Sequence, residues 1–176
     1  MDYNHVTYMR NIATKLKSIQ HVEGDETQKH FFRVSSITNM EELIQNITGL
    51  SGYALVVEDM RMGRFIDNDS ENLLDNQSNV FMLLKQADIA DAESRQNAIS
   101  DCETECMKII AKMFKDWRDD NRPKLPKTGL KNLDRNSFYY QTVGPVADNF
   151  YGVMYTFNIA PPMANKLVYD ENDWLT

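Results

Sequence analysis

Cysteine and histidine are scarce in this chain, and their placement does not suggest a metal centre. Cys102 and Cys106 are the only cysteines among 176 residues, and the three histidines stand far from one another and from that pair. A structural zinc site needs about four Cys or His ligands, so none is expected here. Because a four-residue spacing places both thiols on one face of a helix, we interpret them as reduced core residues. His5, His21 and His30 are interpreted as surface or capping residues.

Long apolar runs are also missing. No segment approaches the ~20 apolar residues that a membrane-spanning helix requires. Residues Met1–Arg10 mix Asp2, Asn4, His5 and Arg10 with apolar residues, unlike the apolar stretch of a signal peptide. We therefore expect a cytoplasmic protein without membrane contact. Its net charge of −7 would repel a phosphate backbone, so nucleic acid is not an expected partner.

The sequence contains no recognisable catalytic motif. Its seven glycines form neither the G-x-G-x-x-G pattern nor the phosphate-binding P-loop. Ser51 lies between Leu50 and Gly52, which is not the G-x-S-x-G elbow of a hydrolase. We predict no catalytic residue, no cofactor and no metal ligand, and we expect the chain not to be an enzyme.

Two groups of carboxylates match known metal-binding sites in part. Asp67–Glu71 carries alternate acidic residues, as a calcium loop does, but Asn72 and Ser78 occupy the positions that need Gly and a bidentate Glu. An acidic, exposed hairpin tip is the favoured interpretation. Glu58 and Asp59 could join Asp67 around Mg²⁺, although no Lys follows at the close spacing such sites use. An uncommon enzyme would be favoured only if Glu58, Asp67 and a His converged in a deep pocket.

Hydrophobic periodicity predicts an α+β chain. Apolar residues recur every three or four positions in two amphipathic helices, and β-branched and aromatic runs indicate buried strands. The expected elements are helix Val6–Ile19, strand Phe31–Ile37, a capping box from Asn39 to Glu42 opening helix Met40–Thr48, strands Tyr53–Met60 and Asn79–Gln86, helix Asp91–Trp117, an irregular connector Asn121–Asn136, and a hairpin of Ser137–Val143 with Phe150–Ile159.

These elements predict one domain over residues 1–160, followed by a C-terminal tail at 161–176. The fold expected is a mainly antiparallel, possibly mixed, sheet of about five strands packed against the N-terminal helix and the long central helix. In the last strand, Tyr151 to Ile159 alternates between a face that should be buried and a face available for a neighbour.

Two segments outside the expected core are candidates for protein contacts. The polar connection Arg61–Ser78 joins two buried strands, and Phe65 and Ile66 could extend a strand into it. The tail keeps apolar and aromatic residues beyond the last strand. Folding of the tail over its own core is the alternative. The contact candidates are Phe65, Asp67, Asp69, Glu71, Tyr169, Trp174 and Leu175.

Charge is unevenly distributed along the chain. Asp88–Glu105 is rich in Asp and Glu with Arg95 as its only basic residue, whereas Asn121–Arg135 is rich in Lys and Arg with Asp134 as its only acidic residue. Like subunits could meet through such opposite patches. Alternatively, the two segments are a solvated helix face and a solvated loop.

The order of elements, closed by the stretch Val143-Gly144-Pro145-Val146-Ala147-Asp148-Asn149-Phe150-Tyr151-Gly152, resembles the tail-completion and tail-terminator (neck) proteins of tailed phages and prophages. The resemblance implies a structural protein that forms a ring where the tail tube meets the head and works by surface complementarity, so the chain would be cytoplasmic or incorporated into a phage-like particle. Its partners would be itself and phage tail or neck proteins. A small cytosolic adaptor that binds one protein as a monomer remains the alternative.

Overall fold

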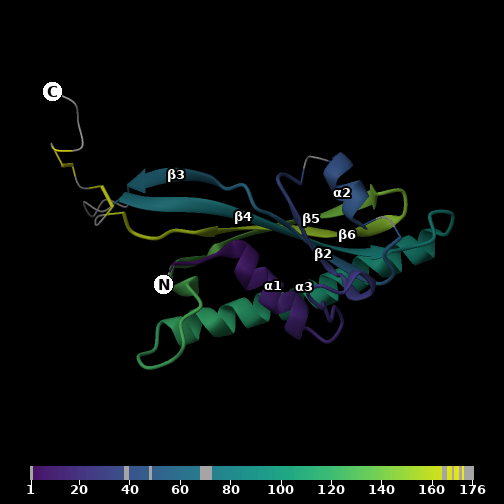
Figure 1. Ribbon diagram of the computed structural model, residues 1–176, viewed down its shortest axis with the longest axis horizontal. Helices are drawn as coiled ribbons and strands as arrows, with labels where there is room; N and C mark the ends of the chain where they lie inside the picture. The colour runs from purple at the N-terminus through teal and green to yellow at the C-terminus, as the bar shows by residue number, and fades with distance from the viewer. Residues whose placement is uncertain are drawn as a thin grey trace.

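A computed structural model of the chain describes residues 2–37, 40–47, 49–67, 73–163, 166, 167, 169, 170 and 172. The fold is α+β, as predicted, with one six-stranded sheet and three α-helices (Figure 1). None of the helices in the described ranges is both long and apolar enough to span a membrane. The elements are α1 (His5–Lys15), η1 (Glu26–Gln28), β1 (Phe31–Val34), α2 (Met40–Ile47), β2 (Tyr53–Glu58), β3 (Met62–Asp67), β4 (Leu73–Gln86), α3 (Ala92–Asp120), η2 (Leu130–Asn132), β5 (Leu133–Val146) and β6 (Phe150–Ile159).

The long strand β4 organises the sheet. The strands lie in the order β1-β2-β4-β6-β5, and β3 pairs with β4 beside this path. The second half of β4 pairs with β2, whereas its first half, from Leu73 to Ser78, pairs antiparallel with β3. On its other edge β4 pairs with β6. All pairs are antiparallel except β1 with β2, so the sheet is mixed.

The polar connection predicted at Arg61–Ser78 is therefore wrong in part, because most of it is strand. Six register pairs, from Met62–Ser78 to Asp67–Leu73, form a hairpin in which the backbone groups of the polar residues are hydrogen bonded. Both strands of this hairpin are exposed or half-buried, so no apolar alternation marked them in the sequence. The suggestion that Phe65 and Ile66 extend a strand is confirmed.

Helix α1 is shorter than predicted at its C-terminal end. Asn4 caps its N-terminus, accepting a hydrogen bond from the Thr7 amide through its side chain at 2.9 Å. The helix ends at Lys15 because Leu16 is extended. Ile19, predicted as the last helical residue, is nevertheless buried, since its amide bonds to the Leu16 carbonyl in a turn that folds it onto the core.

Helix α3 confirms the predicted long helix and packs on the sheet, as expected. Asp91 caps it by accepting a hydrogen bond from the Glu93 amide at 2.9 Å. The apolar stripe predicted from the spacing is buried at Cys102, Cys106, Ile109 and Met113. The helix continues one turn beyond Trp117 to Asp120.

Several strand boundaries differ from the prediction. Strand β1 ends at Val34 and not at Ile37, because the Ser35 amide and hydroxyl both donate to the Glu42 carboxylate at the start of α2. Asn39, the other member of the predicted capping box, lies outside the described residues. Strand β5 begins at Leu133 and not at Ser137, directly after the short helix η2, so the irregular connector is shorter than predicted.

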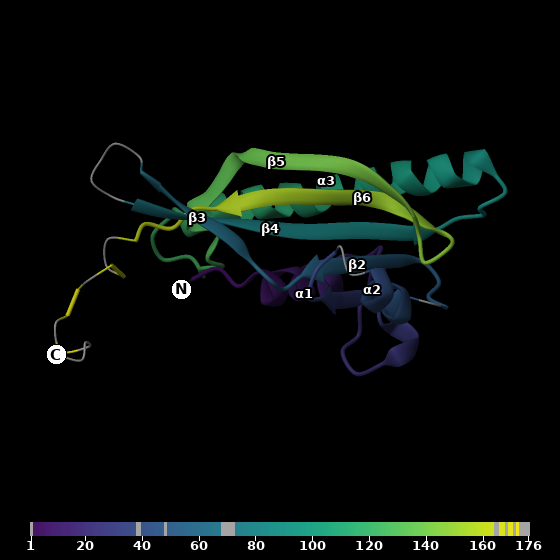
Figure 2. The same ribbon diagram turned by 90° about the horizontal axis from the view of Figure 1, so that it is seen from above.

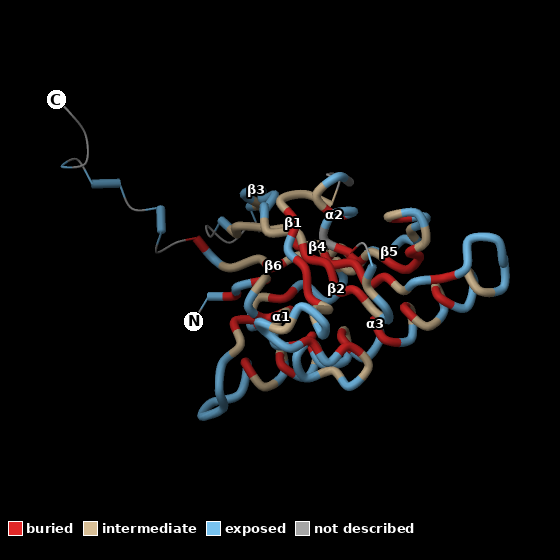
Figure 3. Tube along the Cα trace, turned by 45° about the vertical axis from the view of Figure 1, so that its right-hand side comes forward, coloured by how far each residue is buried: buried red, intermediate tan, exposed pale blue. Residues whose placement is uncertain are grey.

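Different helices pack on the two faces of the sheet. Helices α1 and α3 lie on one face, over a core that includes Leu55, Phe81 and Phe157 (Figure 1). Helix α2 covers only one end of the opposite face, over Val56, Met82 and Phe150. Figure 3 shows the buried residues concentrated in the layer between the sheet and α1 and α3. The second face of β6, expected to be available for a neighbour, is half-buried, since Met154 packs under the α2 cluster.

A glycine holds the N-terminal segment against the connector that follows α3. Gly129 has a φ of 87°, and a Cβ atom there would lie 2.6 Å from the Tyr3 backbone. Only glycine combines this conformation with so close an approach. Tyr3 and Leu130 are both buried in the main core, so this contact joins the first residues of the chain to the segment that follows α3.

Replacing Gly129 by Ala should therefore destabilise the fold strongly. Gly24 is the matched control, because its φ of 82° is equally left-handed but nothing lies within 4 Å of its would-be Cβ. We expect Gly24→Ala to lower the free energy of unfolding by about 1 kcal/mol and Gly129→Ala by about 3 kcal/mol or more. Urea unfolding measures both. Equal losses would show that the backbone contact at Gly129 is dispensable.

Candidate functional site

The β3–β4 hairpin projects from the body of the molecule and carries exposed apolar side chains. Met62 is 79% exposed and Phe65 is 59% exposed. Figures 1 and 2 show the hairpin reaching beyond the helices at one end of the sheet. Apolar side chains this exposed on a projecting element are typical of a contact surface.

The C-terminal tail is fastened to this same hairpin. Pro162 forms an isolated antiparallel bridge with Leu74. The Asp75 amide donates to the Pro161 carbonyl at 2.9 Å, and the Met163 amide donates to the Leu73 carbonyl at 2.8 Å. Tyr169 follows with 75% of its surface exposed. We call the hairpin from Met62 to Ser78, together with the tail from Pro161, the hairpin–tail end.

The structure thus brings together the two segments that were predicted separately as contact elements. Phe65 and Asp67 lie on β3, and Tyr169 lies in the tail. The other four contact candidates, Asp69, Glu71, Trp174 and Leu175, lie outside the described residues. The pairing of tail and hairpin was not predicted, because Pro162 and Leu74 carry no sequence signal for a bridge.

The carboxylates considered for a metal site do not converge. Val57 pairs with Phe81 of β4, so Glu58 lies beside Val80, whereas Asp67 pairs with Leu73 at the start of the same strand. The two carboxylates therefore lie beside positions of β4 that are about seven residues apart. At roughly 3.3 Å per residue this separates them by about 23 Å. Asp59 is engaged by Arg33, with 2.7 Å between Oδ2 and Nη2. Among the described residues, no group of three or more His, Cys, Asp or Glu side chains could hold a metal ion.

The histidines join segments of the fold, which corrects their interpretation as surface or capping residues. His5 and His21 are buried. His21 Nδ1 accepts a hydrogen bond from the His30 amide at 3.3 Å, and His30 Nδ1 lies 2.8 Å from the Tyr53 carbonyl. Each ring therefore satisfies backbone groups that would otherwise be unpaired, a role that isolated histidines do not reveal in a sequence.

His5 illustrates this role most clearly. Its Nε2 lies 2.8 Å from the Val80 carbonyl oxygen, which can only accept, so Nε2 carries the proton. Nδ1 is then the acceptor for the Tyr3 hydroxyl at 3.1 Å. Burial lowers the pKa of His5 to about 4, opposed by the bond to Val80 and assisted by the positive charge of Arg61. The neutral ring therefore ties α1 to the middle of β4.

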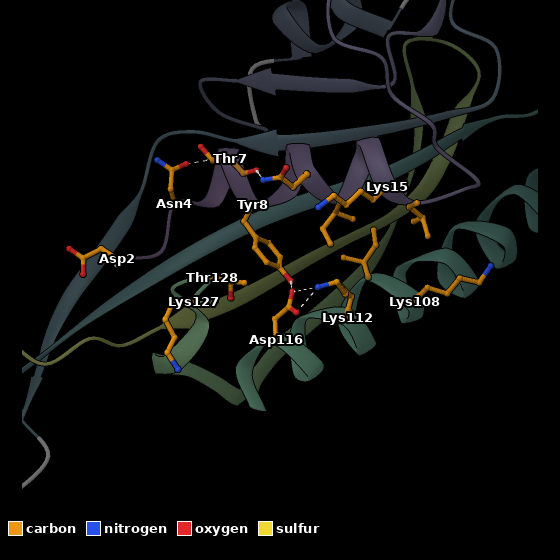
Figure 4. Close-up of a pocket in the computed structure, with 14 residues that line it drawn as sticks. Asp2, Asn4, Thr7, Tyr8, Lys15, Lys108, Lys112, Asp116, Lys127 and Thr128 are labelled. Carbon is orange, nitrogen blue, oxygen red and sulfur yellow. Dashed lines mark hydrogen bonds and ion pairs between the residues drawn. The ribbon is translucent and has the colours of Figure 1, made fainter. Parts of the chain in front are cut away.

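A cleft of about 510 Å³ lies between α1 and α3, and sequence reasoning missed it (Figure 4). Tyr8 and Ile12 line it from α1, Leu16 lines it from directly after that helix, and Ile109 lines it from α3. Four lysines surround it: Lys15, Lys108, Lys112 and Lys127. These come from three distant segments, so only the packing of the helices brings them together.

A buried carboxylate holds one wall of this cleft in place. Asp116 accepts a hydrogen bond from the Tyr8 hydroxyl at 2.8 Å and forms an ion pair with Lys112. Burial, and then the hydrogen bond to Asp116, raise the pKa of Tyr8 far above its usual value, so Tyr8 is a neutral donor. A second buried carboxylate, Asp120, accepts from the Thr128 amide at 2.7 Å and anchors the connector beside the cleft.

Comparison of the chain with protein-family models, curated proteins and solved structures gives no match. The assignment of a function therefore depends on the chain's own residues: the hairpin–tail end and the cleft between α1 and α3.

The neutral, buried His5 makes stability depend on pH. Its pKa is about 4 in the folded chain and 6.5 in the unfolded chain, so the unfolded chain binds more protons between these values. Stability should therefore fall as pH drops from 6.5 to 4, by about 3 kcal/mol from this residue. Urea unfolding of wild type and His5→Gln across this range should give a shallower dependence for the variant. Parallel profiles would contradict the assignment.

Cys102 and Cys106 should be dispensable. Both are free and buried, and burial raises the pKa of Cys102 to about 12 and that of Cys106 further, so neither is a reactive thiolate. Replacing both by Ala should cost roughly 1–3 kcal/mol of stability, measured by urea unfolding, without abolishing partner binding. Fast thiol labelling of the native chain, or stoichiometric zinc, would contradict this interpretation.

Proposed function

We propose that the chain is a non-enzymatic assembly subunit that works through protein–protein contacts at its hairpin–tail end. The observation that carries the proposal is the joining of two segments about ninety residues apart in sequence, by the hydrogen bonds between Leu73–Asp75 and Pro161–Met163. Met62, Phe65 and Tyr169 in these segments are exposed, and apolar side chains gathered on a surface are typical of a protein contact site.

More specifically, we propose a tail-completion or neck subunit of a phage or prophage, with itself and tail or neck proteins as partners. The order of elements supports this, as does the distribution of charge. The acidic segment Asp88–Glu105 includes the first half of α3, and the basic segment Asn121–Arg135 follows its last residue. A helix of 29 residues is about 43 Å long, so the acidic segment and the basic segment lie toward opposite ends of the molecule.

Opposite charges at opposite ends favour head-to-tail contacts between copies. Such heterologous contacts generate rings when the rotation between subunits closes. The basic segment is accessible for this role, because Arg122, Lys124 and Lys131 are exposed. A ring is also the assembly that the family resemblance implies.

The proposal predicts that Phe65→Ser with Tyr169→Ser weakens association by about tenfold or more, because it removes exposed apolar area from the contact surface. Sedimentation velocity of the purified chain, alone and with any tail or neck proteins that the neighbouring genes encode, measures the effect. Met107→Ser is the matched control. Met107 is 52% exposed, similar to Phe65, but lies on α3, outside the hairpin–tail end and outside both charged segments.

Circular dichroism should show both variants folded, since neither change touches the core. Normal association by the Phe65→Ser, Tyr169→Ser variant would overturn the hairpin–tail end as the contact surface. A wild-type chain that stays a monomer and binds none of these proteins would reject the assembly function, and a monomer that binds a single host protein would favour the adaptor alternative.

A further inference from the structure

We propose that the cleft between α1 and α3 is the docking site for the acidic C-terminal segment, residues 166–176, of a second copy of this chain. The inference rests on the proposed assembly function and gives that assembly an acceptor site.

The cleft has the chemistry of a receptor for an apolar peptide with negative charge. Most of its lining area is apolar, and Tyr8, Ile12, Leu16 and Ile109 contribute to it. Its volume of about 510 Å³ lies in the range of roughly 300–1,000 Å³ that is usual for binding pockets. A pocket of this kind can receive one or two large side chains.

Positive charge surrounds this apolar lining. Four lysines and only two aspartates, Asp2 and Asp116, line the cleft, although the chain as a whole has a net charge of −7. Asp116 is buried and paired with Lys112. Lys15 is exposed and makes no ion pair with any residue that the structure describes, and Lys108 reaches only Glu105 on its own helix. The labelled side chains in Figure 4 show the lysines arranged around the cleft.

The C-terminal segment supplies the complementary groups. Tyr169, Trp174 and Leu175 are apolar or aromatic, and the residues between them include three acidic ones, Asp170, Glu171 and Asp173. The large side chains match the apolar lining, and the carboxylates match the lysines around it.

The direction of the tail favours a second copy as its acceptor. Hydrogen bonds hold the tail to β4 as far as Met163, at the end of the sheet. In Figures 1 and 2 the described residues beyond it extend past that end of the sheet, away from α1 and α3. Leu167 and Tyr169 are exposed.

Two full-length variants separate the donor from the acceptor. Trp174→Ser with Leu175→Ser disables the tail and keeps the cleft, whereas Lys15→Glu with Lys108→Glu disables the cleft and keeps the tail. Each variant alone should self-associate at least about tenfold more weakly than wild type, because apolar contacts or charge complementarity are lost. An equimolar mixture should recover association, since one intact tail meets one intact cleft. Sedimentation velocity measures the association of each variant and of their mixture.

Lys17→Glu is the control for charge. Lys17 is exposed and close to Lys15 in sequence but does not line the cleft, so this variant should associate as wild type does. A second measurement adds a fluorescent peptide of residues 166–176 to the Trp174→Ser, Leu175→Ser protein. It should bind, more weakly as salt rises, and a peptide with Asp170, Glu171 and Asp173 replaced by Asn should bind at least about tenfold more weakly.

The outcomes are distinguishable. If wild type associates and the Lys15→Glu, Lys108→Glu variant associates equally well, the cleft is not the acceptor, while the proposed assembly function stands. Failure of the peptide to bind, or of the mixture to recover association, likewise overturns this inference alone. A wild-type chain that remains a monomer with its tail in its own cleft overturns both the second-copy acceptor and self-assembly.

Discussion

The antiparallel ladder between β4 and β6 is the interaction on which the other contacts depend. It runs from the pair Gln77–Ile159 to the pair Gln86–Phe150 without interruption. On its helix-facing side Phe81 of β4 stacks on Tyr155 of β6, Phe138 of the neighbouring β5 stacks on Phe157 of β6, and α3 packs across this layer. The remaining edge of β4 is then free to hold both β2 and β3. The position of the hairpin, of the tail and of both helices follows from this single pairing.

Buried polar groups determine how the helices sit on that ladder. His5 attaches α1 to β4, while Asp116 attaches Tyr8 of α1 to α3. Glu105 adds a third link by accepting from Ser18 at 2.6 Å, next to the turn that follows α1. Burial acts to raise the pKa of Glu105, but hydrogen bonds from Lys108 and Ser18 outweigh it and the pKa is lowered. An apolar interface would let the helices slide, whereas these directional bonds fix the width of the cleft between them.

Apolar periodicity in the sequence predicted individual helices and strands. It did not predict contacts between elements that lie far apart in the chain. The stripe of α3 was predictable because its apolar residues recur at the helical period, and β2 was predictable because it is a continuous run of apolar strand formers. The hairpin of β3 with the first half of β4 was interpreted as a connection, since both of its faces remain accessible and polar residues fill it. His5, Asp116 and Lys15 gave no signal, because their partners lie on other elements. Phe65 and Tyr169 were predicted as contact candidates, but the bonding of the tail to the hairpin emerges only from the fold.

The double pairing of β4 has a consequence for how the chain moves. One half of the strand is buried between β2 and β6, from Phe81 to Leu84, while the other half, from Leu73 to Ser78, is exposed or half-buried beside an exposed β3. Amide hydrogens along one continuous strand should therefore exchange with solvent at very different rates, slowly at the core and quickly at the projecting end. Because both halves share the same backbone, ordering of the projecting end would be transmitted directly into the centre of the sheet.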